Sequence, residues 1–443
     1  MADNANIYKD ASTQGDPGTL QAPKAGDALT WRHIGFVVTS AAMAFLGTAL
    51  WLNSAGIFYR SVADEFGCGL GQVSMYISVS FVATMVLLPI GGRIMEAGRA
   101  RALYVVANVC LGLAFLLNAS AQNIWMMYAA GVLGAGCLAY DMYLMPALVG
   151  RWFKKRTGFV TGLAASMAGA GAAIFNIVGN HMIQNFGWRS GYILFGALVL
   201  CVLVPLIAVF VRSNPEDVGV VPYGAAEAGS AQAGKALEGA EHANVLKSPA
   251  FLMLGLMGIC GGLVTMMSQY MASFAVSVGY ETIIGASMAS AAMVGNMFFK
   301  IFLGAVADKS LTAAVAGGMV FPVVAFAGLI LIGGSNMAAV VFMAFLYGGG
   351  QPSNTVILAL VARRLFGERD YDRIWSSISP FCAAACVFGA TVWGWIYDGT
   401  GSFVLVFATG AVLVCIRFVA YLVARKGAAA IPWLGREAAV GIK

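Results

Sequence analysis

The sequence predicts an all-α membrane protein with twelve transmembrane helices in two six-helix bundles. Of its 443 residues, 60% are hydrophobic and 10% are charged, whereas soluble globular domains have roughly 45–50% and about 25%. Apolar runs of helical length recur along the chain in two sets of six, and about 20 apolar residues suffice to cross a bilayer. A soluble protein is excluded, because so few charges could not cover its surface.

The first six runs define an N-terminal bundle at residues 31–212, and the second six define a C-terminal bundle at 249–425. Charged or turn-forming residues separate the runs. The first set lies at 33–58, 71–95, 102–121, 124–150, 157–183 and 189–212, and the second at 250–277, 282–306, 311–333, 336–362, 374–397 and 402–424.

Three polar segments surround the bundles. Residues 1–30 lack the apolar core of a cleavable signal peptide, and we expect a disordered tail. Residues 213–248 form the only long polar stretch inside the chain and are predicted to link the bundles. Residues 426–443 form the C-terminal tail.

The positions of the basic residues predict the orientation. All but four of the 26 Lys and Arg residues fall on the side that holds both termini and the linker; the exceptions are Arg60, Arg189, Lys300 and Arg417. Basic residues near spans are retained in the cytoplasm. We therefore expect a multi-pass protein of the plasma membrane with cytoplasmic termini. The excess of basic over acidic residues does not require a nucleic-acid partner.

A glycine-containing loop repeats between the halves. The segment GGRIMEAGRAR, from Gly91 to Arg101, follows the second run, and GAVADK, from Gly304 to Lys309, follows the eighth. Gly91 and Gly304 are 213 residues apart, at equivalent points of a six-helix unit. The chain therefore contains two copies of one unit.

These loops resemble the loop motif of the major facilitator superfamily, and further stretches resemble its branch of monocarboxylate transporters and oxalate/formate antiporters. The resemblance covers residues 31–425 and implies a pseudo-symmetric fold that works by alternating access. The further stretches are Arg151-Trp152-Phe153-Lys154-Lys155-Arg156-Thr157-Gly158, Gly187-Trp188-Arg189, Asn214-Pro215-Glu216-Asp217-x-Gly219-x-x-Pro222, and Gly56-Ile57-Phe58-Tyr59 with Glu65-Phe66.

The repeated loops are candidates for a cytoplasmic gate. Glycine permits close helix approach, and an Asp near a helix end can bind the N-terminus of a neighbouring helix. In the first copy, Met95 stands where the second has Asp308, with Glu96 beside it. Simple solvated loop charges are the alternative interpretation. The predicted gating residues are Gly91, Gly98, Arg99, Gly304, Asp308 and Lys309. We also expect Gly158-x-x-x-Gly162 and Gly169-x-Gly171 to be close-packing helix surfaces.

Two ionisable residues are predicted near mid-membrane, where a charge is costly and therefore indicates function. Asp141 lies ten residues before Arg151, and Lys300 lies eight before Asp308, which places them roughly 15 and 12 Å from the same face. Asp141 is a candidate for proton coupling or for a charge pair with Lys300. The alternatives are a buried protonated carboxyl for Asp141 and a side chain that snorkels to the headgroups for Lys300. Arg417, in the last run, is expected to snorkel or pack.

The resemblance also implies a substrate site. Asn296-x-x-x-Lys300-x-x-x-Gly304 resembles the eighth-helix motif in which the branch has an Arg that pairs with the substrate carboxylate, and Lys300 takes that position. Lysine offers a point charge rather than a bidentate fork, so the preference for an anion is kept. Asn53 stands about where animal relatives have a first-helix lysine. Tyr270, Tyr347 and Gln351 complete the predicted cavity; helix packing is the alternative for each.

We therefore predict a secondary transporter of a small organic anion, a monocarboxylate or short dicarboxylate, by proton symport or anion exchange. Its partners are the anion, a proton or counter-anion, and the bilayer. The alternative is a non-transporting membrane sensor or scaffold, which should have a folded domain outside the membrane. We expect no enzyme, cofactor or metal site, because the sequence has no HExxH, GxSxG, P-loop or paired CxxC motif and its three histidines are widely spaced.

Overall fold

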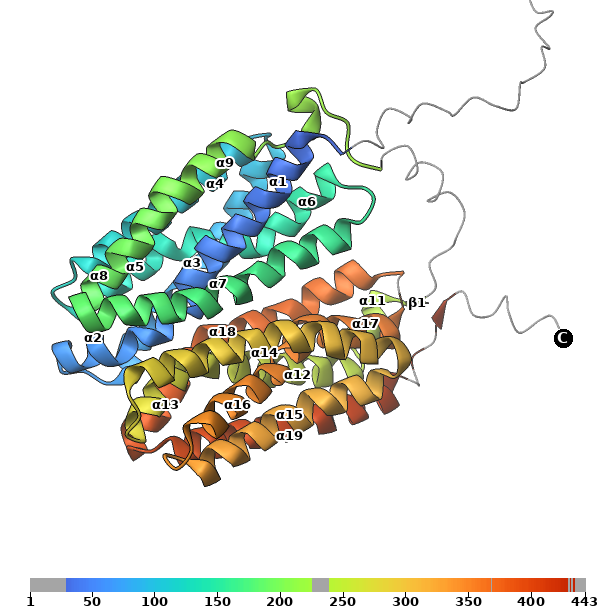
Figure 1. Cartoon of the computed structure of the whole chain (residues 1–443). Coiled ribbons are helices and arrows are strands. Elements are labelled where there is room, and N and C mark those ends of the chain that lie inside the picture. The colour runs from blue at the N-terminus through green and yellow to red at the C-terminus, as the bar shows by residue number, and fades with distance from the viewer. Residues whose placement is uncertain (1–28, 225–238, 368, 429–430, 432, 435–443) are drawn as a thin grey trace, which may run out of the picture.

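The computed structural model describes residues 29–224, 239–367, 369–428, 431 and 433–434. Most of the predicted N-terminal tail therefore lies outside the described residues. In the described chain, 11 helices are long and apolar enough to cross a membrane, and a twelfth, Met337–Gly350, is shorter. Figure 1 shows two helical bundles side by side, one from each half of the chain. The prediction of an all-α membrane protein with twelve spans is confirmed.

The N-terminal bundle contains spans 1–6. Span 1 is α1 (Trp31–Ala42), a π-helical segment (Met43–Asn53) and a 3-10 turn (Ala55–Ile57), followed by the short α2 (Tyr59–Phe66). Spans 2 and 3 are α3 (Leu70–Glu96) and α4 (Ala100–Ala119). Span 4 is α5 (Ile124–Gly136), a π-helical segment (Cys137–Leu144) and α6 (Met145–Trp152). Span 5 is α7 (Thr157–Phe186), and span 6 is α8 (Trp188–Leu198), a π-helical segment (Val199–Leu203) and α9 (Val204–Phe210).

The C-terminal bundle contains spans 7–12. Span 7 is α12 (Pro249–Met266), a 3-10 turn (Met267–Tyr270) and α13 (Met271–Ser277). Spans 8 and 9 are α14 (Thr282–Lys309) and α15 (Leu311–Ile332). Span 10 is α16 (Met337–Tyr347), a 3-10 turn (Gly348–Gly350), a π-helical segment (Ser353–Ile357) and α17 (Leu358–Phe366). Spans 11 and 12 are α18 (Tyr371–Thr400) and α19 (Phe403–Ala428).

Short elements surround the spans. After span 6, a 3-10 turn (Pro215–Val218) is capped by Asn214, whose backbone N–H donates to the Asp217 carboxylate at 3.0 Å. Before span 7, α11 (His242–Leu246) packs on the start of α18, where the His242 backbone N–H donates to Asp370. Strands β1 (Gly239–Ala240) and β2 (Trp433–Leu434) pair antiparallel, so the linker region contacts the C-terminal segment.

Span 10 is broken where the sequence predicts one unbroken run at 336–362. Three consecutive glycines at 348–350 are poor helix formers, and Pro352 has no backbone N–H to donate. The buried Arg417 side chain compensates, because its guanidinium donates to the Gly350 and Gly318 carbonyl oxygens. Arg417 is thus a packing residue, one of the two roles predicted for it.

The two halves also break at one equivalent place. The 3-10 turns of spans 1 and 7 contain Gly56 and Gln269, which are 213 residues apart, the same offset that relates Gly91 to Gly304. The two turns pack directly on each other, since a Cβ added to Gly56 would lie 1.9 Å from the Gln269 carbonyl oxygen. Only glycine permits this approach of two backbones.

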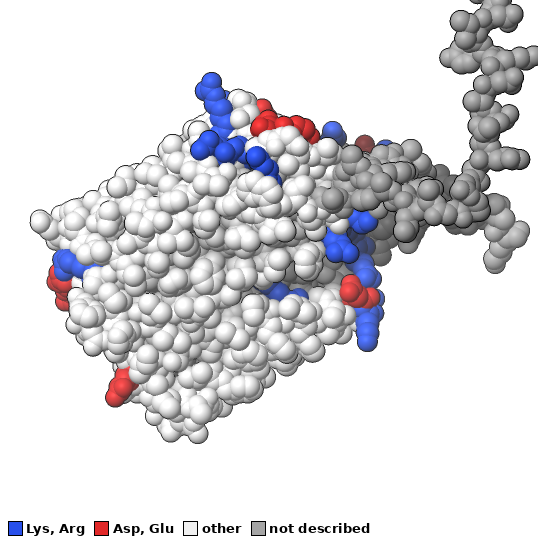
Figure 2. Space-filling model, turned by 45° about the horizontal axis from the view of Figure 1, so that its top comes forward, with Lys and Arg blue, Asp and Glu red and all other residues white. Residues whose placement is uncertain are grey.

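The charged side chains leave a broad uncharged band between the ends of the bundles (Figure 2). Exposed apolar side chains such as Trp125, Ile301 and Leu331 are expected on a surface that faces lipid. The end rich in Lys and Arg, here called the basic end, has the connections 97–99, 153–156, 310 and 367–370; the opposite end, here called the far end, has 67–69, 120–123, 187, 278–281, 333–336 and 401–402.

Candidate functional site

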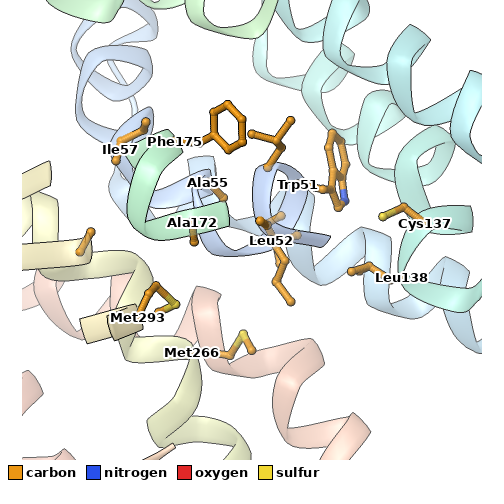
Figure 3. Close-up of a cluster of buried hydrophobic side chains, with 14 of the residues drawn as sticks. Trp51, Leu52, Ala55, Ile57, Cys137, Leu138, Ala172, Phe175, Met266 and Met293 are labelled. Carbon is orange, nitrogen blue, oxygen red and sulfur yellow. The ribbon is translucent and has the colours of Figure 1, made fainter. Parts of the chain in front are cut away.

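The two bundles are joined by hydrogen bonds near the far end. Tyr270 Oη lies 2.9 Å from Ser74 Oγ, and Ser78 Oγ lies 2.8 Å from Thr391 Oγ1. The other linking pairs are Tyr59 with Gln269, Gln184 with Thr282, and Ser290 with the Ala173 carbonyl oxygen. Beneath them, Leu52 and Ala172 of the first bundle share a buried cluster with Met266 and Met293 of the second (Figure 3). The pathway between the bundles is therefore closed at the far end.

Asp398 is a charged member of this closure. Its carboxylate, near the end of α18, accepts the backbone N–H of Leu70 at 3.0 Å and of Gly71 at 2.9 Å. These groups belong to the first turn of α3, where helix N–H groups have no partner within the helix and the helix dipole favours an anion. A side chain of the C-terminal bundle thus caps a helix of the N-terminal bundle.

At the basic end, the predicted gating residues are not engaged in this conformation. Cβ atoms added to Gly162 or Gly304 would meet no atom within 4 Å. The exposed Arg99, Asp308 and Lys309 side chains make no hydrogen bond or ion pair with other described residues. The close packing expected at Gly158 and Gly162 is likewise absent among the described residues, whereas Gly171 packs closely against the Phe45 backbone of span 1, as expected.

The first-half loop of the predicted gate has a local structural role. Gly91 packs against the Tyr140 ring. A Cβ added to Gly91 would lie 2.1 Å from that ring, so glycine at this position allows span 2 to approach span 4. Gly98 adopts φ +75°, a left-handed conformation that glycine favours, and ends the turn before α4. Met95 is buried and its carbonyl oxygen accepts the Arg151 guanidinium at 3.2 Å.

Three predicted substrate residues have polar groups without a protein partner. Lys300, in the second half of α14, is partly buried and makes no hydrogen bond or ion pair with a described residue. Asn296 Oδ1, one turn earlier on the same helix, and Gln351 Nε2, at the break in span 10, are buried and have no hydrogen-bond partner of ordinary length among the described residues; the Gln351 side chain lies beside the Tyr347 hydroxyl. A cation, an acceptor and a donor thus come from two adjoining spans of the C-terminal bundle.

The other three substrate candidates bind protein groups. Tyr347 is fully buried, and its hydroxyl donates to the Val264 carbonyl oxygen at 2.6 Å, next to the break in span 7. Tyr270 belongs to the far-end closure, with its hydroxyl also against the Ala390 carbonyl oxygen. Asn53 Nδ2 donates to the Ala168 carbonyl oxygen at 3.4 Å, which links spans 1 and 5.

Asp141 lies inside the N-terminal bundle, where it is 6% exposed. Its Oδ1 accepts Asn108 Nδ2 at 3.2 Å, and its Oδ2 faces Gly47 of span 1. The carboxylate makes no ion pair with any described residue, Lys300 included. Similar depth therefore does not bring the two charges into contact in this conformation.

The far-end stretches named in the sequence come together in one cluster. Glu65 forms an ion pair with Arg189 at 2.7 Å and accepts the Trp188 indole N–H at 2.6 Å, and the guanidinium lies 4.2 Å from the Trp188 ring centroid. The hydrogen bond from Arg189, followed by that from Trp188, lowers the pKa of Glu65. This cluster fastens α2 to α8 within one bundle.

Two hollows on the described chain lie away from these residues. One, of about 430 Å³, runs between α12 and α19 and is lined by apolar side chains such as Met253, Ile416 and Val419. The other, of about 140 Å³, lies at the far end near Phe274 and Phe403. Neither contains a predicted site residue.

Comparison with known proteins identifies the fold. A family model described as Major Facilitator Superfamily matches residues 34–390. The chain belongs to the major facilitator superfamily. Human monocarboxylate transporter 11 is 27% identical over 185 residues, which are 39% of this chain and 38% of the human protein. The uncharacterized MFS-type transporter YhjX of Escherichia coli (strain K12) is 22% identical over 331 residues, covering 71% of this chain and 76% of that protein.

Solved structures of superfamily members share the fold. A D-xylose-proton symporter superposes with a TM-score of 0.67 at 13% identity, over 90% of this chain and 98% of its own. An inward-facing, occupied bacterial homologue of the human lysosomal transporter Spinster superposes with a TM-score of 0.65 at 12% identity, over 89% and 96%. The relatives and structural neighbours named here are all transporters, not enzymes, and this chain is a multi-pass membrane protein of their superfamily.

Two residues of the site were missed in the sequence. Asp398 sits among polar residues at a helix end, where a carboxylate has no unusual cost. Asn108 is an amide within an apolar run. It contacts Asp141, which lies 33 residues further along the chain on another span. A buried amide opposite a buried carboxyl is visible only once the helices are packed.

Proposed function

We propose that this superfamily transporter moves a small organic anion, a monocarboxylate or a short dicarboxylate, by proton symport or anion exchange. The observation that supports the anion is Lys300, which has no partner among the described residues, together with the buried polar groups of Asn296 on the same helix and Gln351 on an adjoining span. A cation at mid-membrane without a protein partner is costly unless a ligand or water compensates it. A carboxylate would accept from Lys300 and Gln351.

The fold suggests how the anion crosses. Residues 31–212 rock against 249–425, and we propose that the pathway opens at the basic end while the far end is closed. We propose that this end is cytoplasmic, that the protein resides in the plasma membrane, and that both termini face the cytosol. In the opposite state, the loops with Gly91, Gly98 and Arg99 and with Gly304, Asp308 and Lys309 close the basic end.

Ligand-induced thermal stabilisation tests the substrate. A ligand that binds the folded state raises its apparent stability. A panel of mono- and dicarboxylates with the detergent-solubilised protein should yield at least one anion that raises the Tm. Lys300→Gln should abolish that rise, and Lys300→Arg should retain part of it, because the positive charge remains.

Lys426→Gln is the matched control, since it removes the same charge from the exposed end of α19, in the same bundle but outside the site and the gate. It should leave the ligand-induced rise unchanged. If Lys300→Gln still shows the full rise, the anion does not bind at Lys300. If neutral analogues stabilise as well as the acids, the substrate is not an anion.

A further inference from the structure

Asp141 and Asn108 form a buried pair with one hydrogen bond and two unpaired oxygens. Asn108 is fully buried on α4 and donates from Nδ2 to Asp141 Oδ1 at 3.2 Å. The remaining oxygens, Asp141 Oδ2 and Asn108 Oδ1, are buried and have no hydrogen-bond partner of ordinary length among the described residues, although the Cys137 thiol lies beside the carboxylate. Both approach Gly47, since an added Cβ there would lie 2.7 Å from the first and 3.7 Å from the second.

The orientation of the amide is fixed by a second bond. Asn108 Nδ2 also donates to the Tyr104 carbonyl oxygen at 3.0 Å, so both of its hydrogens are used. Turning the amide over would place Asn108 Oδ1 against that carbonyl oxygen, where no hydrogen is available. The amide oxygen therefore stays on the side of the unpaired carboxyl oxygen.

One hydrogen between these two oxygens would satisfy both. We propose that Asp141 and Asn108 are a proton-binding pair, in which a proton on Asp141 Oδ2 donates to Asn108 Oδ1. The carboxyl and the amide then exchange two hydrogen bonds in a closed ring. Without the proton, two buried acceptors and a buried negative charge face Gly47 with only the Cys137 thiol, a weak donor, beside them, and such burial is costly inside a protein.

The surroundings supply no alternative counter-charge. Span 1 presents Gly47 and Thr48 to the pair, and neither titrates. The titratable neighbours are neutral side chains, Tyr104 on α4 and Cys137 and Tyr140 on the π-helical segment itself. The charged or titratable groups on the other packed helices stand toward their ends: Tyr76, Arg93 and Glu96 on α3, Tyr128 on α5 and Arg151 on α6.

The pair is placed to link proton binding to the motion of span 1. Gly47 belongs to the π-helical segment Met43–Asn53, which leads directly into the turn where Gly56 packs on Gln269 of the other bundle. If span 1 moved so that Gly47 left its present position, water could reach the two oxygens and the proton could leave. Lys300 and Asp141 would then be coupled through helix movement rather than by contact. This link to transport rests on the proposed function, whereas the proton-binding pair does not.

Infrared difference spectroscopy of the full chain in lipid nanodiscs tests the pair directly. At neutral pH, the wild type should show the C=O stretch of a neutral, buried carboxyl, and Asp141→Asn should lose it. The Asn108→Leu variant should shift or remove the same band, because the partner oxygen is gone. Asn118→Leu is the matched control, since Asn118 is another fully buried amide of α4, and it should leave the band unchanged.

Two outcomes would overturn the pair. One is a wild-type spectrum with no neutral-carboxyl band, or a band that survives Asp141→Asn. The other is a Tm that rises with added Na⁺ in the wild type but not in Asp141→Asn, which would assign the two oxygens to a metal cation. Asp141→Asn itself should fold, because its amide can exchange the same two hydrogen bonds with Asn108.

A transport measurement then separates the pair from the proposed function. In vesicles, Asp141→Asn should lose uptake driven by a pH gradient but keep counterflow at equal pH, since it permanently mimics the protonated pair. If the infrared band behaves as expected while no anion is transported by the wild type, the proposed substrate is wrong and the pair stands. If uptake driven by the gradient survives in Asp141→Asn, the pair does not couple protons to transport.

Discussion

Removing the Asp398 carboxylate should open the far end of the transporter. The carboxylate accepts two backbone N–H groups across the interface, at 3.0 and 2.9 Å. Hydrogen bonds to a charged group contribute about 1.5–3 kcal/mol when shielded, but Asp398 is exposed and solvent reduces its contribution. We take about 1.5 kcal/mol for both bonds together, which corresponds to roughly a tenfold change in the ratio of open to closed states. Asp398→Asn keeps one acceptor oxygen, so roughly threefold is expected.

Thiol accessibility measures this ratio. Met293, buried beneath the closure, is replaced by cysteine in a variant without native cysteines, and a membrane-impermeant maleimide is added on the far side. The labelling rate should rise about tenfold in Asp398→Ala and about threefold in Asp398→Asn. Asp64→Asn is the matched control, because Asp64 is also a far-end carboxylate but pairs with Arg60 on its own helix at 3.3 Å. Equal rates in all four proteins would refute the assignment of Asp398 to the closure.

Three further changes follow from the packing. Gly56→Ala should impair the far-end closure and raise the same labelling rate, because its Cβ would lie 1.9 Å from a carbonyl oxygen, whereas Gly92→Ala meets no atom within 4 Å and should change nothing. Arg417→Leu leaves two buried carbonyl oxygens without a donor and should lower the free energy of unfolding in detergent by about 3 kcal/mol; an unchanged unfolding midpoint would contradict this role. Because its pKa is lowered, ionised Glu65 stabilises the fold above its ordinary value of 4.5 and loses this effect as the pH falls through the lowered value. Glu65→Gln should therefore lower the Tm at neutral pH and converge with the wild type in acid.

The sequence predicts the helices well because hydrophobicity, charge and length act locally. Lys300 and Asp141 stand out in apolar runs, so their depth in the membrane could be predicted. The directions in which their side chains point could not. Asp141 turns to Asn108 of span 3, away from Lys300, and this depends on the rotation of span 4 in its π-helical segment. The break in span 10 could have been predicted from its three glycines and Pro352. The Asp398 cap could not, because it joins residues 327 and 328 positions apart.

The 213-residue offset that aligns the turns at Gly56 and Gln269 also aligns residues of unlike chemistry. Asp141 corresponds to Asn354, and Asn185 corresponds to Asp398. Each half thus has a carboxyl group where its counterpart has an amide, but at different depths: one in the middle of the first bundle, the other at the far end of the second. An amide does not ionise as a carboxyl group does, so the duplicated architecture is symmetric in shape and asymmetric in protonation chemistry. A molecule with its two halves exchanged would be chemically different. The state that is open at one end and the state that is open at the other are therefore chemically different as well.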